Sequence, residues 1–250
     1  MQPRSVASQG QSRPRDTIVP VSAQRLRVWF TKGDRVRYIS HLDVLRYWER
    51  AIRRAELPLA YSQGFTPHPK IAFAGPLPLG FTSEGELMDV TLDERVEPSE
   101  FRARLTCETS ADLALTSVSE VALAAPPPQA VVIWADYRVT LPGVPADQAD
   151  TAVQGFLSRE SHPCTVEKGD RTKTYDLRPS VAILSASAGE QGTILAMRVS
   201  AHQNLTARPE HVVEALFPGA VATDIVRTGL VLDETSAARD AWRRKGQYEG

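Results

Sequence analysis

Residues 25–55 read RLRVWFTKGDRVRYISHLDVLRYWERAIRRA, and this stretch predicts a strand followed by a helix. Polar and apolar residues alternate along Arg25–Thr31, which is the period of a strand with one buried face. After a short turn, Ser40 and Asp43 have the spacing of a helix N-cap in which side chains satisfy free backbone N–H groups. We therefore expect a β-strand at Arg25–Thr31 and an α-helix at Ser40–Ala55.

The expected helix has two chemically different faces. Four apolar residues recur at helical spacing and are expected to face the core: Leu42, Leu45, Trp48 and Ile52. Four arginines form a stripe on the opposite face: Arg46, Arg50, Arg53 and Arg54. Such a stripe is suited to phosphates, although a solvated helix face with a Glu49–Arg53 pair is the alternative interpretation.

The rest of the chain predicts an α+β fold of two tandem ferredoxin-like (β-α-β-β-α-β) halves with antiparallel sheets. In the first half we expect further strands at Ile71–Ala74, Glu86–Leu92 and Leu113–Leu123 and a helix at Pro98–Cys107. In the second half we expect strands at Ile133–Leu141, Cys164–Lys168, Thr172–Arg178, Val181–Ala186, Thr193–Ala201 and Ala220–Leu232. Its helices are expected at Ala146–Arg159 and Pro209–Phe217.

An internal duplication is suggested by an offset of 111 residues, which aligns Arg27-Val28 with Arg138-Val139 and Pro98 with Pro209. Any two halves of this element order and equal length would align in the same way. The expected parts are a disordered leader at 1–23, the halves at 24–123 and 131–234, a Pro-rich extended linker at 124–130 and a basic C-terminal tail at 235–250.

Composition limits the classes of protein to consider. With 250 residues and 42% hydrophobic residues, the chain is able to bury a core in each half. The two cysteines, Cys107 and Cys164, form no metal or disulfide motif, so we expect a cytoplasmic protein without a metal or other cofactor. The N-terminal residues lack the apolar region of a signal peptide, so we expect none, and no apolar run is long enough for a membrane span. The formal net charge of -1 excludes a uniformly basic protein, but ten Lys/Arg against four Asp/Glu make residues 25–70 locally basic.

The stretch YISHLDVLRYWERAIRRAELPLAYSQGFTPHPKIAFAGPLPLG, residues 38–80, resembles the signature of a bacterial family of unknown function. Members of that family are encoded beside or fused to a cobalamin-binding radical SAM protein. The resemblance is strong over 25–92 and looser in the second half, where residues 173–178 and 227–228 are similar to later motifs. It implies a radical SAM protein as partner and, through neighbouring ribosome and RNA-processing genes, a link to RNA; it implies no reaction. This chain lacks the CxxxCxxC iron–sulfur motif, so radical chemistry would belong to the partner.

The loop that follows the helix carries aromatic and basic residues between glycines and prolines. Aromatic rings stack on unpaired bases while arginine and lysine hold the backbone of a single strand. Gly64 permits a positive φ, and Pro67 and Pro69 stiffen the loop. The residues predicted to bind RNA or another ligand are Arg37, Ser40, His41, Asp43, Arg46, Arg50, Arg53, Tyr61, Gln63, Gly64, Phe65, His68, Lys70, Arg178 and Arg227.

Three residues are candidates for catalysis: His41, His68 and Lys70. A histidine titrates near neutral pH and suits acid/base work, and lysine stabilises phosphate charge. Each histidine also fits a structural role, His41 as a cap or core residue and His68 as a loop residue between prolines. In the second half, Arg178 is expected either to pair with Asp176 or to meet Arg227 across the sheet.

Three functions remain open. The first is an RNA-binding or substrate-presenting partner of a radical SAM enzyme, linked to tRNA or rRNA modification or processing. The second is an RNA-modifying or RNA-cleaving enzyme that uses His41 or His68 as acid/base. The third is a scaffold that docks protein without contacting RNA, through an apolar loop around Phe65, Phe73 and Phe81.

Overall fold

The computed structural model describes residues 22–168, 171–202, 205–233 and 235. The first half contains β1 (Gln24–Lys32), α1 (His41–Arg54), β2 (Ile71–Phe73), β3 (Thr82–Leu92), α2 (Pro98–Cys107) and β4 (Leu115–Val121). The second half contains α3 (Pro128–Val131), β5 (Val132–Leu141), α4 (Ala146–Leu157), β6 (Pro163–Lys168), β7 (Arg171–Asp176), β8 (Val181–Gly189), β9 (Gly192–His202), β10 (Leu205–Thr206), α5 (Pro209–Leu216) and β11 (Asp224–Leu232). Each helix and strand that we gave bounds for in the sequence is present, with ends that differ by a few residues.

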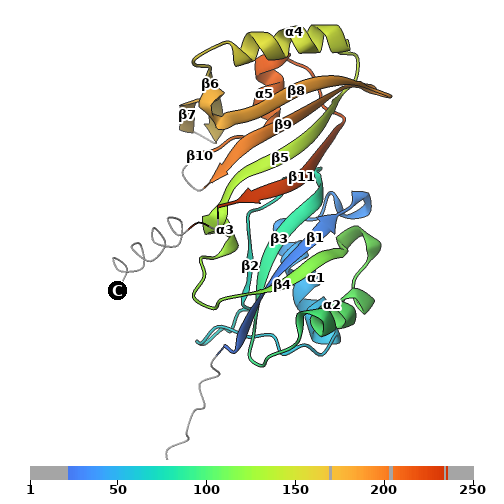
Figure 1. Ribbon diagram of the computed structural model, residues 1–250, viewed down its shortest axis with the longest axis vertical. Coiled ribbons are helices and arrows are strands. Elements are labelled where there is room, and N and C mark those ends of the chain that lie inside the picture. Colours follow the sequence, from blue (N-terminus) through green and yellow to red (C-terminus); the bar gives the residue numbers. More distant parts are fainter. Residues whose placement is uncertain (1–21, 169–170, 203–204, 234, 236–250) are drawn as a thin grey trace, which may run out of the picture.

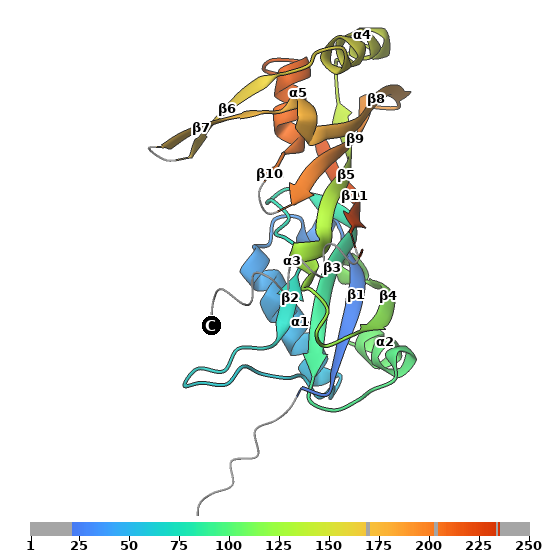
Figure 2. The same cartoon turned by 60° about the vertical axis from the view of Figure 1, so that its left-hand side comes forward.

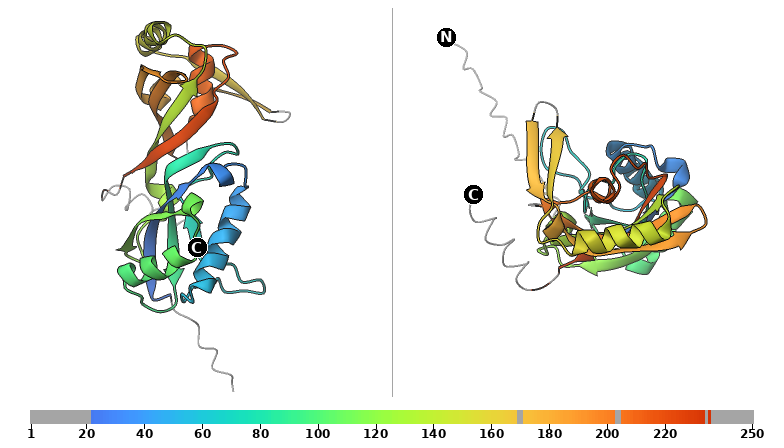
Figure 3. Two further views of the ribbon diagram at one scale, coloured as in Figure 1. Left: turned by 90° about the vertical axis from the view of Figure 1, so that its right-hand side faces the viewer. Right: turned by 90° about the horizontal axis from the view of Figure 1, so that it is seen from above.

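One mostly antiparallel sheet runs through both halves, in the order β10-β9-β5-β11-β3-β1-β4, with β2 paired to β3 and β8 to β9 (Figure 1). Within the first half the strands follow the order β2-β3-β1-β4, and within the second the corresponding order is β8-β9-β5-β11. Strands β6 and β7 form a separate two-stranded ribbon, which stands away from the main sheet in Figure 3. The mixed α+β class is confirmed.

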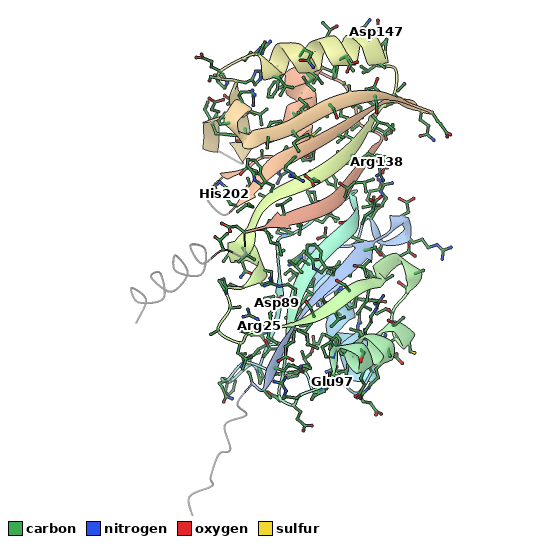
Figure 4. The ribbon with its side chains drawn as sticks, in the orientation of Figure 1. Arg25, Asp89, Glu97, Arg138, Asp147 and His202 are labelled. Carbon is green, nitrogen blue, oxygen red and sulfur yellow. The ribbon has the colours of Figure 1, made fainter. Side chains whose placement is uncertain are left out.

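The strands of both halves belong to one sheet, because the halves are joined edge to edge by a parallel pairing of β11 with β3. Only two residue pairs are in register, Val226 with Thr82 and Arg227 with Ser83. The Ser83 hydroxyl also donates to the Arg227 carbonyl over 3.1 Å. At the same junction Arg138 forms an ion pair with Glu84, and Figure 4 shows Arg138 beside this boundary. The sequence could not reveal the junction because residues 82–85, TSEG, carry no alternation of polar and apolar residues.

Each half has its own hydrophobic core. In the first half, Leu26 and Val28 of β1 lie in one cluster with residues of both α1 and α2, so both helices cover the same face of the sheet. Phe30 and Trp48 are fully buried there, with ring centroids 4.9 Å apart. On the other face, Arg27 and Asp89 form a buried two-point ion pair, with contacts of 2.9 and 3.2 Å.

Two expectations about local structure need correction. Leu42 was expected in the core but is 59% exposed, because the buried stripe of α1 begins at Val44 and continues through Trp48, Ala51 and Ile52. The linker at 124–130 is not wholly extended, since Pro128 is buried and begins the short helix α3. The predicted leader and tail fall almost entirely outside the described residues. No helix in the described ranges has the length and apolar character needed to cross a membrane.

Candidate functional site

The start of helix α1 is fixed by the predicted cap. The Ser40 hydroxyl oxygen accepts a hydrogen bond from the Asp43 backbone N–H at 3.2 Å and donates to the Asp43 carboxylate at 2.7 Å. The hydrogen bond from Ser40 holds the pKa of Asp43 below its ordinary value. Ser40 and Asp43 therefore bind each other, and they set the direction in which α1 leaves the loop.

Three arginines of α1 lie in solvent: Arg46, Arg50 and Arg53, which we call the arginine face. The side chains of Arg46 and Arg53 are 67% and 61% exposed, and their contacts to Asp43 and Glu49 are long, at 3.5 and 3.9 Å. The fourth arginine of the predicted stripe, Arg54, instead binds Glu108 through two contacts of 2.8 Å. The stripe thus has three arginines, and the alternative Glu49–Arg53 pair exists as one long contact.

The loop after α1 is a hairpin with an exposed tip, and Figure 2 shows it reaching out from the body between α1 and β2. Ser62 and His68 exchange hydrogen bonds across it, from Ser62 N–H to the His68 carbonyl (2.8 Å) and from His68 N–H to the Ser62 hydroxyl (2.9 Å). Gly64 has a φ of 140°, which a residue with a side chain rarely adopts. Phe65, at the tip, has a relative exposure of 107%.

The hairpin is fastened to the arginine face through Tyr61. The Tyr61 hydroxyl donates to Glu49 at 3.3 Å, and Glu49 is the residue that pairs with Arg53. Partial burial, and then the charge of Glu49, raise the pKa of Tyr61. At the base of the hairpin, the Lys70 ammonium donates to the Ser22 hydroxyl at 3.0 Å. The structure therefore fixes the hairpin to α1 at Tyr61 and leaves Gln63, Gly64, Phe65 and His68 exposed.

Three other predicted site residues, Arg37, Arg178 and Arg227, lie away from the arginine face and the hairpin. Arg37 donates to the Gly80 carbonyl at 2.8 and 3.0 Å and to Asp224 of β11 at 3.1 Å, so it holds the two halves together. Arg178 donates to the carbonyls of Leu157 and Val181 inside the second half.

The expectation that Arg178 meets Arg227 was wrong, because β5 and β9 separate β11 from β8, where the contacts of Arg178 lie. The expected ion pair with Asp176 was also wrong. The Asp176 carboxylate instead accepts the backbone N–H groups of His162 and Arg178, since β7 ends at Asp176.

Arg227 belongs to a buried group at the junction. Its Nε lies 3.2 Å from Glu86, and the two side chains are 5% and 7% exposed. Its guanidinium also donates to the Pro76 carbonyl at 3.3 Å and lies 5.9 Å from the centre of the Tyr137 ring. Lys32, buried nearby, donates to the Arg37 carbonyl at 3.1 Å, and burial lowers the pKa of its amine.

Above this group lies a cavity of about 730 Å³, which we call the interhalf cleft because both halves line it. The first half contributes His41 and Leu45 of α1 and residues 71 and 73–78. The second half contributes parts of β5, β10 and β11 and the beginning of α5. The polar side chains that line the cleft are His41, Gln129, Tyr137, Thr206, Arg208 and Arg227, and its described lining contains no carboxylate. Sequence reasoning identified His41 and Arg227 but missed the cleft.

The three catalytic candidates do not share the cleft. His41, the first residue of α1, lines it and meets Phe73 edge to face, with ring centroids 4.9 Å apart. His68 and Lys70 belong to the hairpin and do not line the cleft. Among the described residues no group of three or more histidine, cysteine, aspartate or glutamate side chains is placed to hold a metal ion.

The expected apolar docking loop around three phenylalanines was wrong for Phe81. Phe81 is 6% exposed and packs in the second core near Tyr137. Phe73 is half-buried between His41 and Phe30. Of these three rings only Phe65 is exposed, because the other two fill space beneath neighbouring elements.

Comparison with known proteins defines the class of this chain. A family described as "Uncharacterized protein conserved in bacteria (DUF2344)" matches residues 25–209, and the chain belongs to this family. None of the curated proteins compared with the chain matches it. A solved structure entitled "Crystal Structure of a Cbf5-Nop10-Gar1 Complex" contains a chain that is similar at 15% identity with a TM-score of 0.45. The similarity covers 81% of this chain and 48% of that one, so this chain spans about half of that chain's length; a likeness this distant supports no functional argument.

Proposed function

We propose that this protein binds unpaired RNA with the arginine face and the adjoining hairpin. The observation that carries the proposal is the position of a fully exposed Phe65 on a hairpin fastened, through Tyr61 and Glu49, beside Arg46, Arg50 and Arg53. Proteins that bind single strands combine cations along the backbone with rings on which bases stack.

The charges of the arginine face are available to a ligand. Exposed ion pairs contribute about 0–1 kcal/mol, and those of Arg46 and Arg53 are long as well as exposed. A phosphate that replaces such a weak partner gains charge-assisted hydrogen bonds and releases counterions. Binding by this surface should therefore weaken steeply as salt is added.

The hairpin is organised before any ligand arrives. Its two sides are tied by backbone hydrogen bonds, including Lys70 N–H to the Ala60 carbonyl at 2.8 Å, and prolines at 67 and 69 restrict the backbone. A rigid loop loses less conformational entropy on binding than a flexible one. The exposed Phe65 ring thus costs little to order when a base stacks on it.

The test is salt-dependent binding of the full chain to a fluorescent single-stranded RNA. The variant Arg46/Arg50/Arg53→Glu should bind far more weakly and reduce the slope of log K against log salt by about 2, the value expected for three lost phosphate contacts on a single strand. The matched control, Arg95/Arg102/Arg159→Glu, reverses three exposed arginines on other segments and should keep the affinity. Equal losses in the two variants, or no binding by the wild type at low salt, would refute the proposal.

We also propose that the protein presents RNA to a radical SAM enzyme for modification or processing. The support is the resemblance of residues 38–80 to a family encoded beside such enzymes, together with the basic surface described above. Co-expression with the neighbouring radical SAM protein, followed by affinity purification with and without ribonuclease, tests the partnership. If the radical SAM protein is recovered neither with nor without ribonuclease, the proposed partnership is refuted.

We propose further that each half is a ferredoxin-like unit and that the two arose by duplication. The support is the shared strand order and the prolines that begin α2 and α5 at the offset of 111 residues. Superposition of residues 24–123 on 131–234 in an experimental structure tests this, and helices on opposite sheet faces in the two halves would contradict it.

A further inference from the structure

The interhalf cleft has features of a binding site that are independent of the arginine face. We infer that it binds one nucleotide, with the base against its apolar walls and the phosphate beside Arg208, and, resting on the proposed function, that this is an unpaired nucleotide of the bound RNA. The cavity of about 730 Å³ falls within the roughly 300–1,000 Å³ of known small-molecule sites.

The charge of the cleft favours an anion. Its described lining includes two arginines and no aspartate or glutamate. Arg227 is neutralised by Glu86 at the floor, whereas Arg208 is exposed and forms no ion pair with a carboxylate of the described chain. Arg208 therefore has donors free for a phosphate, and guanidinium groups match phosphate geometry closely.

The walls of the cleft favour a flat ring. Apolar surface is supplied by Ile71, Phe73, Leu77 and Leu230. Tyr137 adds an aromatic ring, and burial raises the pKa of its hydroxyl, in keeping with a neutral phenol. His41 is exposed at the mouth and is held by its edge-to-face contact with Phe73. Phosphate alone would leave this apolar surface unused, and an apolar ligand would leave Arg208 unused. A nucleotide uses both.

The cleft and the proposed RNA surface share helix α1. His41 and Leu45 line it from helix α1, and Arg46 of the arginine face follows Leu45 directly. Arg46 lies five positions after His41, about 7.5 Å along the helix axis, and about 100° around that axis from Leu45. An RNA strand that curves around α1 from the arginine face therefore reaches the cleft, where one unstacked base is able to enter.

The experiment titrates the full chain with the four nucleoside 5′-monophosphates by calorimetry, with the corresponding nucleosides and inorganic phosphate as comparisons. Arg208→Ala should weaken nucleotide binding about tenfold or more by removing the charged donor. Thr206→Trp should abolish it by filling the cleft from an exposed strand position. Arg159→Ala and Thr172→Trp, exposed positions that do not line the cleft, are the matched controls and should bind as the wild type does.

The same titrations separate the failure of this inference from that of the proposed function. If Arg46/Arg50/Arg53→Glu loses RNA but keeps nucleotide affinity, and Thr206→Trp weakens both, the cleft holds a nucleotide of the RNA. If the wild type binds no RNA but binds nucleotides in an Arg208-dependent manner, the cleft site stands and its ligand is a free nucleotide.

Three results would overturn the inference. They are no nucleotide binding at millimolar concentration, an affinity for inorganic phosphate equal to that for nucleotides, or a nucleotide affinity that neither Arg208→Ala nor Thr206→Trp changes. Circular dichroism establishes that each variant is folded. The two cleft variants change different side chains, so either one suffices if the other does not fold.

Discussion

The arginines of this protein fall into two groups, and the contrast separates structure from function. At the junction, Arg37 donates to the Gly80 carbonyl of its own half and to Asp224 of the other half. Arg227 is almost wholly buried and contacts Glu86 and the Pro76 carbonyl of the other half. On α1, the arginine face extends into solvent, where the ion pairs of Arg46 and Arg53 are long and Arg50 forms none with the described part of the chain. Within the first half, Arg25 is likewise bound by the fold, since its Nε lies 3.3 Å from Asp89. Figure 4 labels both residues. Charge that the fold already satisfies is not available to a ligand, whereas exposed charge is.

The largest effect is expected from breaking the buried pair at the junction. Glu86→Ala leaves the Arg227 guanidinium buried without its carboxylate, and loss of one partner of a buried pair costs about 3–5 kcal/mol of folding free energy. Urea unfolding followed by circular dichroism measures it. Glu84→Ala, which breaks the exposed pair with Arg138, is the control and should cost about 1 kcal/mol or less. Similar losses for the two variants would show that burial does not distinguish these pairs.

A smaller effect, on binding alone, is expected at the hairpin tip. Phe65→Ala should weaken RNA binding by about 1–3 kcal/mol, the contribution of one stacked base. The side chain is fully exposed, so the midpoint of thermal unfolding should stay unchanged. Phe65→Trp is the matched variant and should keep or increase the affinity. If the Phe65→Ala variant and the wild type have equal affinities for RNA in an anisotropy titration, the Phe65 ring does not belong to the RNA-binding surface.

The smallest effect is expected from the cap of α1, and it depends on pH. The folded pKa of Asp43 is lowered by its hydrogen bond from Ser40, so the carboxylate contributes stability above its ordinary pKa and loses it as pH falls through the folded value. The difference in Tm between the wild type and Asp43→Asn should therefore shrink below about pH 4.

Ser40→Ala removes the donor to that carboxylate, so the same substitution of Asp43 in its background should show a weaker pH dependence. A difference in Tm that stays constant between pH 7 and pH 3 in the wild-type background would contradict this role of Asp43.

Local patterns predicted much of the fold. Helix α2 begins and ends where its proline and apolar spacing indicate, and Ser40 caps α1 as its spacing with Asp43 predicts. Leu42 was misplaced because helical spacing alone does not say where a buried stripe begins; Val44 is the first residue of α1 that the sheet covers. Phe81 was misplaced because the sequence of a Gly/Pro-rich segment does not show whether the other half of the molecule covers its aromatic residue.

The α+β class and the order of helices and strands follow from the sequence, because these depend on residues within about one β-α unit. Only the tertiary structure decided how the halves join. Ser83 and Arg227 meet across 144 positions of the chain, and no local period encodes that pairing. The cleft likewise exists only where α1, β5 and β11 come together, since a cavity is a property of the surfaces that surround it and not of any one segment.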